Sequence, residues 1–131
     1  QKLVNYAGHA SVNVWRGNLL TSEESHSLEN GERLSVFVMM NCLNGYFQDV
    51  ALDSLAESLL KAERGGAVAV WASSAMTYPD QQALMNREFY RQLGNRSLTL
   101  GEAAARAKAA VLDPDVRRSW ILLGDPTTRI K

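Results

Sequence analysis

The segment LSVFVMMNCLNGYF occupies residues 34–47. Residues 34–40 are apolar except for Ser35, with no alternation of polar and apolar positions. This pattern is typical of a strand buried on both faces, as at the centre of a parallel sheet. Turn residues follow over 41–45, so the only cysteine of the chain, Cys42, lies where the strand ends. In open α/β sheets, ligands and catalytic groups gather at this edge.

A second apolar run ends in a similar way, this time in a histidine. We predict a strand over residues 2–7 and a turn over 8–11 that contains His9. If both strands end at the same edge of one sheet, they place an imidazole beside a thiol, the minimal apparatus of a thiol nucleophile. The alternative is that Cys42 is a small buried hydrophobe, as most free cysteines are.

Composition limits the class of protein. The chain has 131 residues, 46% of them hydrophobic and 21% charged, which are ordinary values for one globular domain with a real core. Its net charge is zero and it has no basic run, so nothing indicates nucleic acid or an acidic membrane surface as a partner. No apolar stretch approaches the roughly 20 residues of a membrane span.

Other chemistries find little support in the sequence, and we expect no metal and no cofactor. One cysteine and two histidines without short spacing make a poor zinc site. The chain has neither a phosphate-binding loop of the Walker type nor a GxGxxG motif. Ser73 and Ser74 follow an apolar run, but no GxSxG elbow surrounds them. We expect His26, on a polar segment, to lie at the surface.

Strands and helices are predicted to alternate along the chain. We expect strands over 2–7, 34–40, 67–72 and 118–123, and a short extended or irregular piece over 12–15. We expect helices over 21–28, from the Asp53-Ser54 cap to the Gly65-Gly66 stop, over 81–93 and over 99–112. Helices between buried strands require crossover connections, so the fold class is α/β, with a mostly parallel sheet of about four strands flanked by helices.

The beginning of the chain, QKLVNYAGH, enters a strand without a charged leader and is not typical of a signal peptide. We expect that the chain, 1–131, is a single domain cut from a larger one.

Six segments, which together cover almost the whole chain, resemble peptidase family C25, the gingipain-like family of caspase-like cysteine proteases. They are NYAGHASVNVW (5–15), MMNCLNGYF (39–47), SLAESLLKAERGGAVAVWASS (54–74), PDQQALMN (79–86), LGEAAARAK (100–108) and WILLGDPT (120–127). The specific part is a hydrophobic strand ending in histidine followed by one ending in cysteine. The GDP near the end also occurs in the related CHAT domains and is less diagnostic.

The resemblance implies a caspase-like sheet, truncated at its N-terminal side, and a cysteine endopeptidase. His9 is then the catalytic histidine and Cys42 the nucleophile that forms a thioester with a polypeptide substrate. The N–H groups of Ala10 and Cys42 form the oxyanion site. The resemblance also implies a bacterial protein that is secreted or held at the cell surface.

The loop after residue 72 is where similar proteins build part of the substrate pocket. Ser73, Ser74 and Tyr78 are candidates for its lining. Trp71 could also line it, but we favour Trp71 as a core residue. Asp80 is the nearest acidic candidate for selecting a basic substrate side chain, and we expect it to cap its helix instead.

Two departures from the family pattern bear on activity. The family usually has glycine after the catalytic histidine, whereas this chain has Ala10. If that position needs a left-handed backbone, alanine costs roughly 1–2 kcal/mol. The second departure is that the family's upstream strands and helices are missing. We therefore expect residues 2–7 to form an open edge that pairs with a second copy or with the missing N-terminal half.

Two alternatives to a peptidase stay open at this point. One is a non-catalytic caspase-like interaction module that keeps the strands without the chemistry. The other is a generic flavodoxin-like domain that binds a small molecule at its strand ends.

Overall fold

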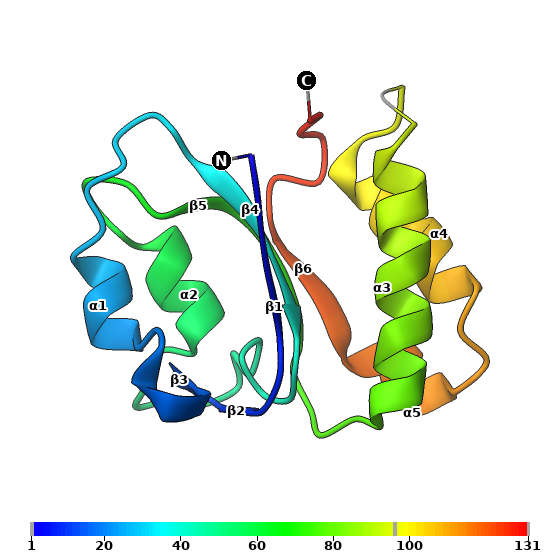
Figure 1. Ribbon diagram of the computed structural model, residues 1–131, viewed down its shortest axis with the longest axis horizontal. Helices are drawn as coiled ribbons and strands as arrows, with labels where there is room; N and C mark the ends of the chain where they lie inside the picture. Colours follow the sequence, from blue (N-terminus) through cyan, green and yellow to red (C-terminus); the bar gives the residue numbers. More distant parts are fainter. Residues whose placement is uncertain (1, 96, 131) are drawn as a thin grey trace.

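The computed structural model describes residues 2–95 and 97–130, which form a four-stranded sheet between two layers of helices (Figure 1). The strands are β1 (Leu3–Ala7), β4 (Ser35–Met40), β5 (Ala67–Ser73) and β6 (Trp120–Gly124). Their order is β1-β4-β5-β6. β1, β4 and β5 are parallel neighbours and β6 is antiparallel to β5, so the predicted α/β fold with a mostly parallel sheet is confirmed.

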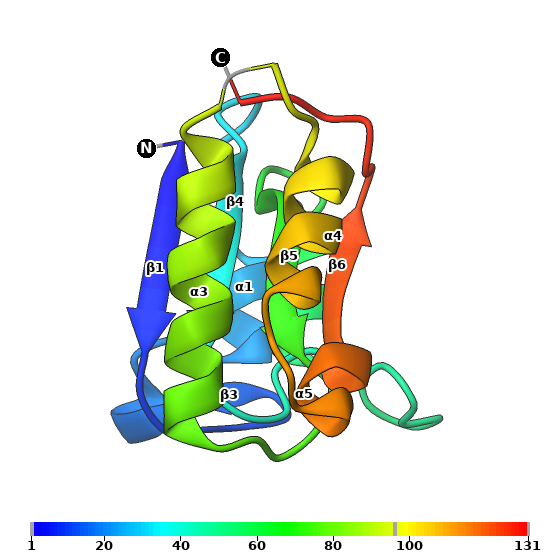
Figure 2. The same ribbon diagram turned by 90° about the vertical axis from the view of Figure 1, so that its right-hand side faces the viewer.

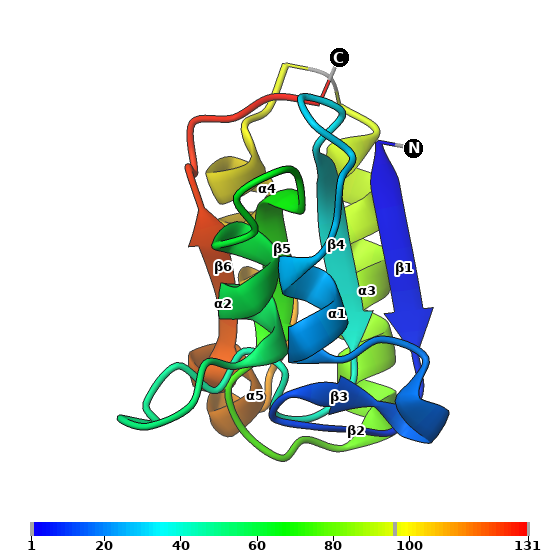
Figure 3. The same ribbon diagram turned by 90° about the vertical axis from the view of Figure 1, so that its left-hand side faces the viewer.

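Both faces of the sheet are covered, which explains why β4 is continuously apolar. Val36 and Val38 pack into the core under α3 (Pro79–Leu93), α4 (Leu100–Ala109) and α5 (Pro114–Ser119), on the face shown in Figure 2. Phe37 and Met39 point into the core on the other face, where α1 (Ser22–His26) and α2 (Leu55–Leu60) lie over the sheet (Figure 3).

Trp71 on β5 lies in the first of these cores, as predicted. Its side chain is buried and its ring stacks on Phe89 of α3 with the ring centroids 4.9 Å apart. The alternative that Trp71 lines a substrate pocket therefore falls away.

A small second sheet lies beyond the carboxyl ends of β1 and β4 (Figure 3). It consists of β2 (Ala10–Ser11) and β3 (Val14–Trp15), which are antiparallel, and a short 3₁₀ helix, η1 (Arg16–Asn18), follows. The sequence predicted only a turn and an irregular piece here, because ladders of two residues leave almost no periodic signal.

The predicted helix starts at three hydroxyl residues are confirmed. Thr21, Ser54 and Thr99 each accept a hydrogen bond from the backbone N–H three residues later. In each case the glutamate at that third position bonds back to the N–H of the capping residue, which completes a capping box. Each box satisfies two N–H groups that a helix start otherwise leaves unpaired.

Several predicted helix ends are wrong. α1 ends at His26 rather than at residue 28, α2 at Leu60 well before Gly65, and α4 at Ala109 rather than at residue 112. Beyond α1 and α4 the chain keeps a last turn of i→i−3 bonds, from Leu28 N–H to Ser25 O and from Val111 N–H to Lys108 O, which shows how a tighter final turn blurs a helix end. His26 is exposed, as expected.

The predicted strand start at residue 118 is also wrong, because residues 114–119 form α5. Asp113 Oδ1 accepts hydrogen bonds from the N–H groups of Asp115 and Val116, and Pro114 occupies the first turn. Asp-Pro thus starts a new helix here, after α4 has already ended at Ala109. Within the described ranges, no helix is long and apolar enough to cross a membrane.

Candidate functional site

The register of the parallel strands brings His9 and Cys42 to the same edge of the sheet. Ala7 of β1 pairs with Met40 of β4, and the N–H of Gly8 donates to Met40 O over 3.1 Å. His9 and Cys42 each lie two residues beyond that last pair. His9 is exposed and Cys42 is half-buried. The structure therefore places both side chains at the carboxyl ends of adjacent strands.

The turn that carries His9 is held through its backbone. The carbonyl oxygen of His9 accepts hydrogen bonds from Tyr6 Oη at 2.8 Å and from Arg16 N at 3.0 Å. The ring of Tyr6 stacks on that of Trp15, with centroids 4.2 Å apart and planes 7° apart. These contacts fix the main chain at His9 while its imidazole stays accessible.

An open pocket of about 340 Å³ lies beside His9. Its lining comes from the β2–β3 hairpin and η1, including Ala10, Trp15, Arg16 and Asn18. The pocket adjoins the histidine at this edge of the sheet.

Ala10 shows no sign of the strain that its replacement of glycine could bring. It lies in β2 and, among the described residues, the non-glycine positions with positive φ are Asn18 and Leu43. The Ala10 side chain is half-buried and packs against the core cluster on the α1–α2 face. Arg16 N–H bonds to His9 O, which makes Ala10 and Trp15 a non-hydrogen-bonded pair, so the Ala10 N–H points away from β3.

The loop that carries Cys42 is tight and strained. Leu43, directly after the cysteine, has a φ of 68°, which costs an L-residue roughly 1–2 kcal/mol. Gly45 N–H then donates to Ser73 O at the end of β5 over 2.9 Å. A Cβ at Gly45 would lie 3.2 Å from that same oxygen, so any larger residue there would push the loop against β5. Backbone strain of this kind persists only where the surrounding contacts hold the segment in place, and it is common at functional sites.

The sulfur of Cys42 has two polar neighbours. Its thiol donates to Thr77 O, 3.7 Å away, and Gln82 Nε2 lies 3.8 Å from Sγ. Gln82 belongs to the first turns of α3 and is only 6% exposed. Its amide also donates to both oxygens of Thr77, with Oγ1 at 2.7 Å and O at 3.1 Å. Sequence reasoning missed Gln82, because a glutamine on a helix carries no signal of what it faces.

Asn44 connects the cysteine loop to the hairpin that follows His9. Its buried Oδ1 accepts from Trp15 Nε1 at 2.9 Å and from Asn41 Nδ2 at 2.6 Å. Its Nδ2 donates to Ser11 O at 2.6 Å and reaches Val12 O at 3.5 Å. Asn44 was predicted only as a turn residue, yet it ties together the two segments that bear the candidate dyad.

The backbone N–H of Cys42 is a further group of interest. Within the described residues it donates to no acceptor. Asn44 N–H instead turns back to Cys42 O over 3.0 Å, which shapes the turn around the cysteine.

The three candidate pocket residues differ in exposure. The hydroxyls of Ser73 and Ser74 are buried and bond to the carbonyls of Ala75 and Ser119. Tyr78 is 74% exposed and precedes α3 as its N-terminal flanking residue. Asp80 lies within the first turn of α3 and does not cap it, which corrects the expectation that it would.

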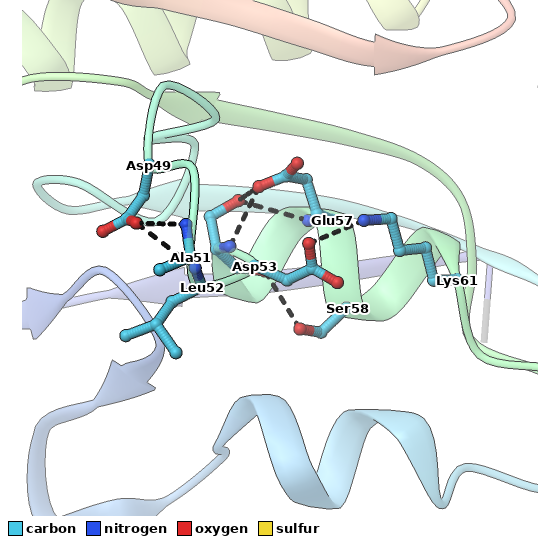
Figure 4. A network of polar contacts seen from close by, with 8 residues as sticks. Asp49, Ala51, Leu52, Asp53, Glu57, Ser58 and Lys61 are labelled. Carbon is cyan, nitrogen blue, oxygen red and sulfur yellow. Dashed lines mark hydrogen bonds and ion pairs between the residues drawn. The ribbon is translucent and has the colours of Figure 1, made fainter.

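The segment after the cysteine loop is anchored before α2 begins (Figure 4). Asp49 Oδ1 accepts from the N–H groups of Ala51 and Leu52, and Lys61 pairs with Asp53 over 2.6 Å. The Glu57 carboxylate bonds back to the helix start as part of the capping box. In the described ranges, no group of three or more His, Cys, Asp and Glu side chains is placed to hold a metal ion.

The family model of peptidase family C25 matches residues 1–131. A crystal structure of the Arg-specific cysteine proteinase gingipain R is similar, with a TM-score of 0.82 and 26% identity over 99% of this chain and 33% of that one. The complex of Porphyromonas gingivalis RgpB pro- and mature domains gives a TM-score of 0.87 and 23% identity over 96% of this chain and 33% of that one.

A third solved structure, described only as a protease, has a TM-score of 0.77 and 16% identity over 98% of this chain and 35% of that one. No curated protein matched the sequence. The chain thus spans about a third of the length of the solved structures it matches. Their shared fold confirms the predicted caspase-like α/β architecture. With its full length matched by the family model and its strands arranged as in gingipain R, the chain belongs to peptidase family C25.

Proposed function

We propose that this chain is the catalytic portion of a cysteine endopeptidase that cleaves polypeptides through a His9/Cys42 dyad. The observation that carries the proposal is the β1–β4 register, which puts an imidazole and the only thiol of the chain at matching positions on neighbouring strands. Family membership and the likeness to a cysteine proteinase support the same chemistry.

The reaction begins with transfer of the Cys42 thiol proton to His9. The thiolate attacks the peptide carbonyl carbon, and the carbonyl electron pair moves to oxygen. Collapse of this intermediate breaks the C–N bond as His9 returns the proton to the leaving amine, and a thioester remains. His9 then takes a proton from water, the hydroxide attacks the thioester, and the acid and the thiol are released.

The developing oxyanion needs hydrogen-bond donors, and the N–H groups of Ala10 and Cys42 are our candidates. The Ala10 N–H points away from β3, and the Cys42 N–H has no acceptor among the described residues. One such donor typically contributes about 3 kcal/mol to lowering the barrier. This chemistry uses protein groups alone, so the proposal invokes neither a metal nor a cofactor.

Substrate would lie across the pocket beside His9 and the loop before α3. We propose that Tyr78, which is exposed, contacts the substrate, and that the buried Ser73 and Ser74 hydroxyls hold the loop that presents it. The chain is, in this proposal, the C-terminal portion of a larger peptidase domain. Further strands, or a second copy of the chain, would pair with β1 at the edge of the sheet. A secreted or cell-surface location goes with the gingipain-like function.

Alkylation of Cys42 by iodoacetamide at neutral pH tests the dyad directly. We expect labelling faster than that of an unactivated cysteine and at least several-fold slower in His9→Ala, because the imidazole would no longer take up the thiol proton. His26→Ala is the matched control: it removes an exposed histidine from α1 and should leave the rate unchanged. Equal rates in all three proteins would refute the dyad.

A non-catalytic interaction module is the second candidate, and one observation favours it. The Cys42 thiol donates a hydrogen bond to Thr77 O, a contact that favours the neutral thiol over the thiolate that catalysis needs. A protein containing the whole domain, assayed on a peptide library with Cys42→Ala as control, separates the two functions. Hydrolysis that Cys42→Ala abolishes supports the peptidase, and peptide binding without hydrolysis supports the module.

A further inference from the structure

The Gln82 amide reaches the candidate nucleophile from the side of α3. Its Nε2 lies 3.8 Å from Cys42 Sγ, and the side chain is 6% exposed, so water competes little for its N–H groups. The residue comes from a helix on the opposite face of the sheet from the β2–β3 hairpin and α2. It therefore approaches the sulfur independently of the elements that carry His9.

The two neighbours of the sulfur favour opposite protonation states. Thr77 O can only accept a hydrogen bond, so it holds the neutral thiol and repels a thiolate. Gln82 Nε2 can only donate, so its contact strengthens when the sulfur becomes negative.

The amide is also shared. Nε2 carries two hydrogens and faces three acceptors: Thr77 Oγ1 at 2.7 Å, Thr77 O at 3.1 Å and Cys42 Sγ at 3.8 Å. With a neutral thiol, the two shorter contacts hold both hydrogens on Thr77. Once the proton has passed from Cys42 to His9, the charged sulfur becomes the better acceptor and competes for one of them.

We propose that Gln82 is a positioning residue that stabilises the Cys42 thiolate and fixes the Thr77 carbonyl against which the neutral thiol rests. This inference rests on the proposed role of Cys42 as nucleophile. Because the donor is a neutral amide, its contribution does not itself titrate over the working pH range.

The segments around the sulfur carry several ionisable groups. They are His9 after β1, Tyr46 and Asp49 after the cysteine, Tyr78 and Asp80 at the start of α3, and Arg87, Glu88, Tyr90 and Arg91 further along α3. Among the described residues, no carboxylate makes a hydrogen bond to Sγ. A carboxylate introduced at position 82 would thus be a new charge at the sulfur.

The test is the pH dependence of iodoacetamide alkylation of Cys42 in the intact chain. Gln82→Glu keeps the shape of the side chain but replaces the donor with a carboxylate, so we expect the midpoint of the alkylation profile to rise by about one pH unit or more. Gln82→Met keeps the bulk and removes the amide, with its N–H donors, without adding a charge, and should raise the midpoint by about half a unit. Tryptophan fluorescence reports whether each variant is folded, and if one unfolds, the other decides.

Gln81→Glu is the matched control. It adds the same charge one residue earlier on α3, where the Gln81 amide bonds to Asp80 rather than to the sulfur. We expect its midpoint to move by less than about 0.3 unit. Unchanged midpoints in the folded position-82 variants, or equal shifts for Gln81→Glu and Gln82→Glu, would overturn the proposal.

The same assay separates this inference from the proposed function. Suppose that Cys42 is alkylated at the same rate in His9→Ala as in the unaltered chain, while the Gln82 variants shift the pH midpoint. The dyad is then refuted and the role of Gln82 at the sulfur stands. If His9→Ala slows alkylation and the Gln82 variants shift nothing, the dyad stands and this inference fails.

Discussion

Replacing Asn44 by leucine is expected to destabilise the protein far more than a loop substitution usually does. Leucine has the same branched skeleton of heavy atoms as asparagine but none of its polar atoms. The change leaves Trp15 Nε1 and Asn41 Nδ2 without their acceptor, and both residues are buried. An orphaned buried donor costs roughly 1–3 kcal/mol, so the two together predict a loss of about 2–6 kcal/mol. The free energy of unfolding of a typical domain is only about 5–15 kcal/mol in total.

Equilibrium unfolding in urea, followed by tryptophan fluorescence, measures this loss. Asn13→Leu is the control, since Asn13 is an exposed asparagine between β2 and β3, and its substitution should stay within about 0.5 kcal/mol. We also expect Asn44→Leu to reduce the effect of His9 on Cys42 alkylation, because Asn44 holds the hairpin to the cysteine loop. A destabilisation below about 1 kcal/mol would refute the reasoning, because the orphaned donors would then have found other partners.

Three further outcomes follow from particular contacts. Gly45→Ala should lower stability by about 1–3 kcal/mol in thermal unfolding, because its Cβ would meet Ser73 O at 3.2 Å, whereas Gly94→Ala, which meets only ordinary contacts, should not. Hydrogen bonds from Arg91 and Gln92 lower the pKa of Glu88 to about 2, so its stabilisation is present above the ordinary value of 4.5 and is lost as the pH falls toward 2. In acid unfolding, Glu88→Gln should lose less stability than the parent over this pH range. Unfolding curves of the two proteins that coincide would contradict the prediction. Sedimentation velocity at tens of micromolar should show association through the open edge of β1, and a clean monomer would argue against pairing there.

The buried strands and the helix starts were the most predictable parts of the fold. β4 and β5 are apolar on both faces because helices cover both, and this pattern needs no knowledge of distant residues. The hydroxyl caps are equally local, since each bonds within its own first turn. By contrast, α5 was missed because an Asp-Pro pair such as Asp113-Pro114 is typical both of the end of one helix and of the start of the next.

For the site, the sequence predicted which residues lie at the edge but not what surrounds them. His9 and Cys42 could be placed because each follows an apolar run. Asn44 and Gln82 could not, since their partners lie 29 and 40 residues away in the chain. The positive φ of Leu43 also escaped prediction, because leucine rarely adopts it and only the docking of the loop on its neighbours imposes it.

The two ends of the described chain lie together, and this has a practical consequence. Lys2 and Ile130 line one pocket at the end of the sheet opposite Cys42, and Figure 1 shows both termini on that side. A fluorescent protein, an affinity tag or a bead linker fused to either end would extend from the same side of the molecule, opposite the thiol. Immobilised on a surface by either terminus, the protein would hold its cysteine edge toward the solution.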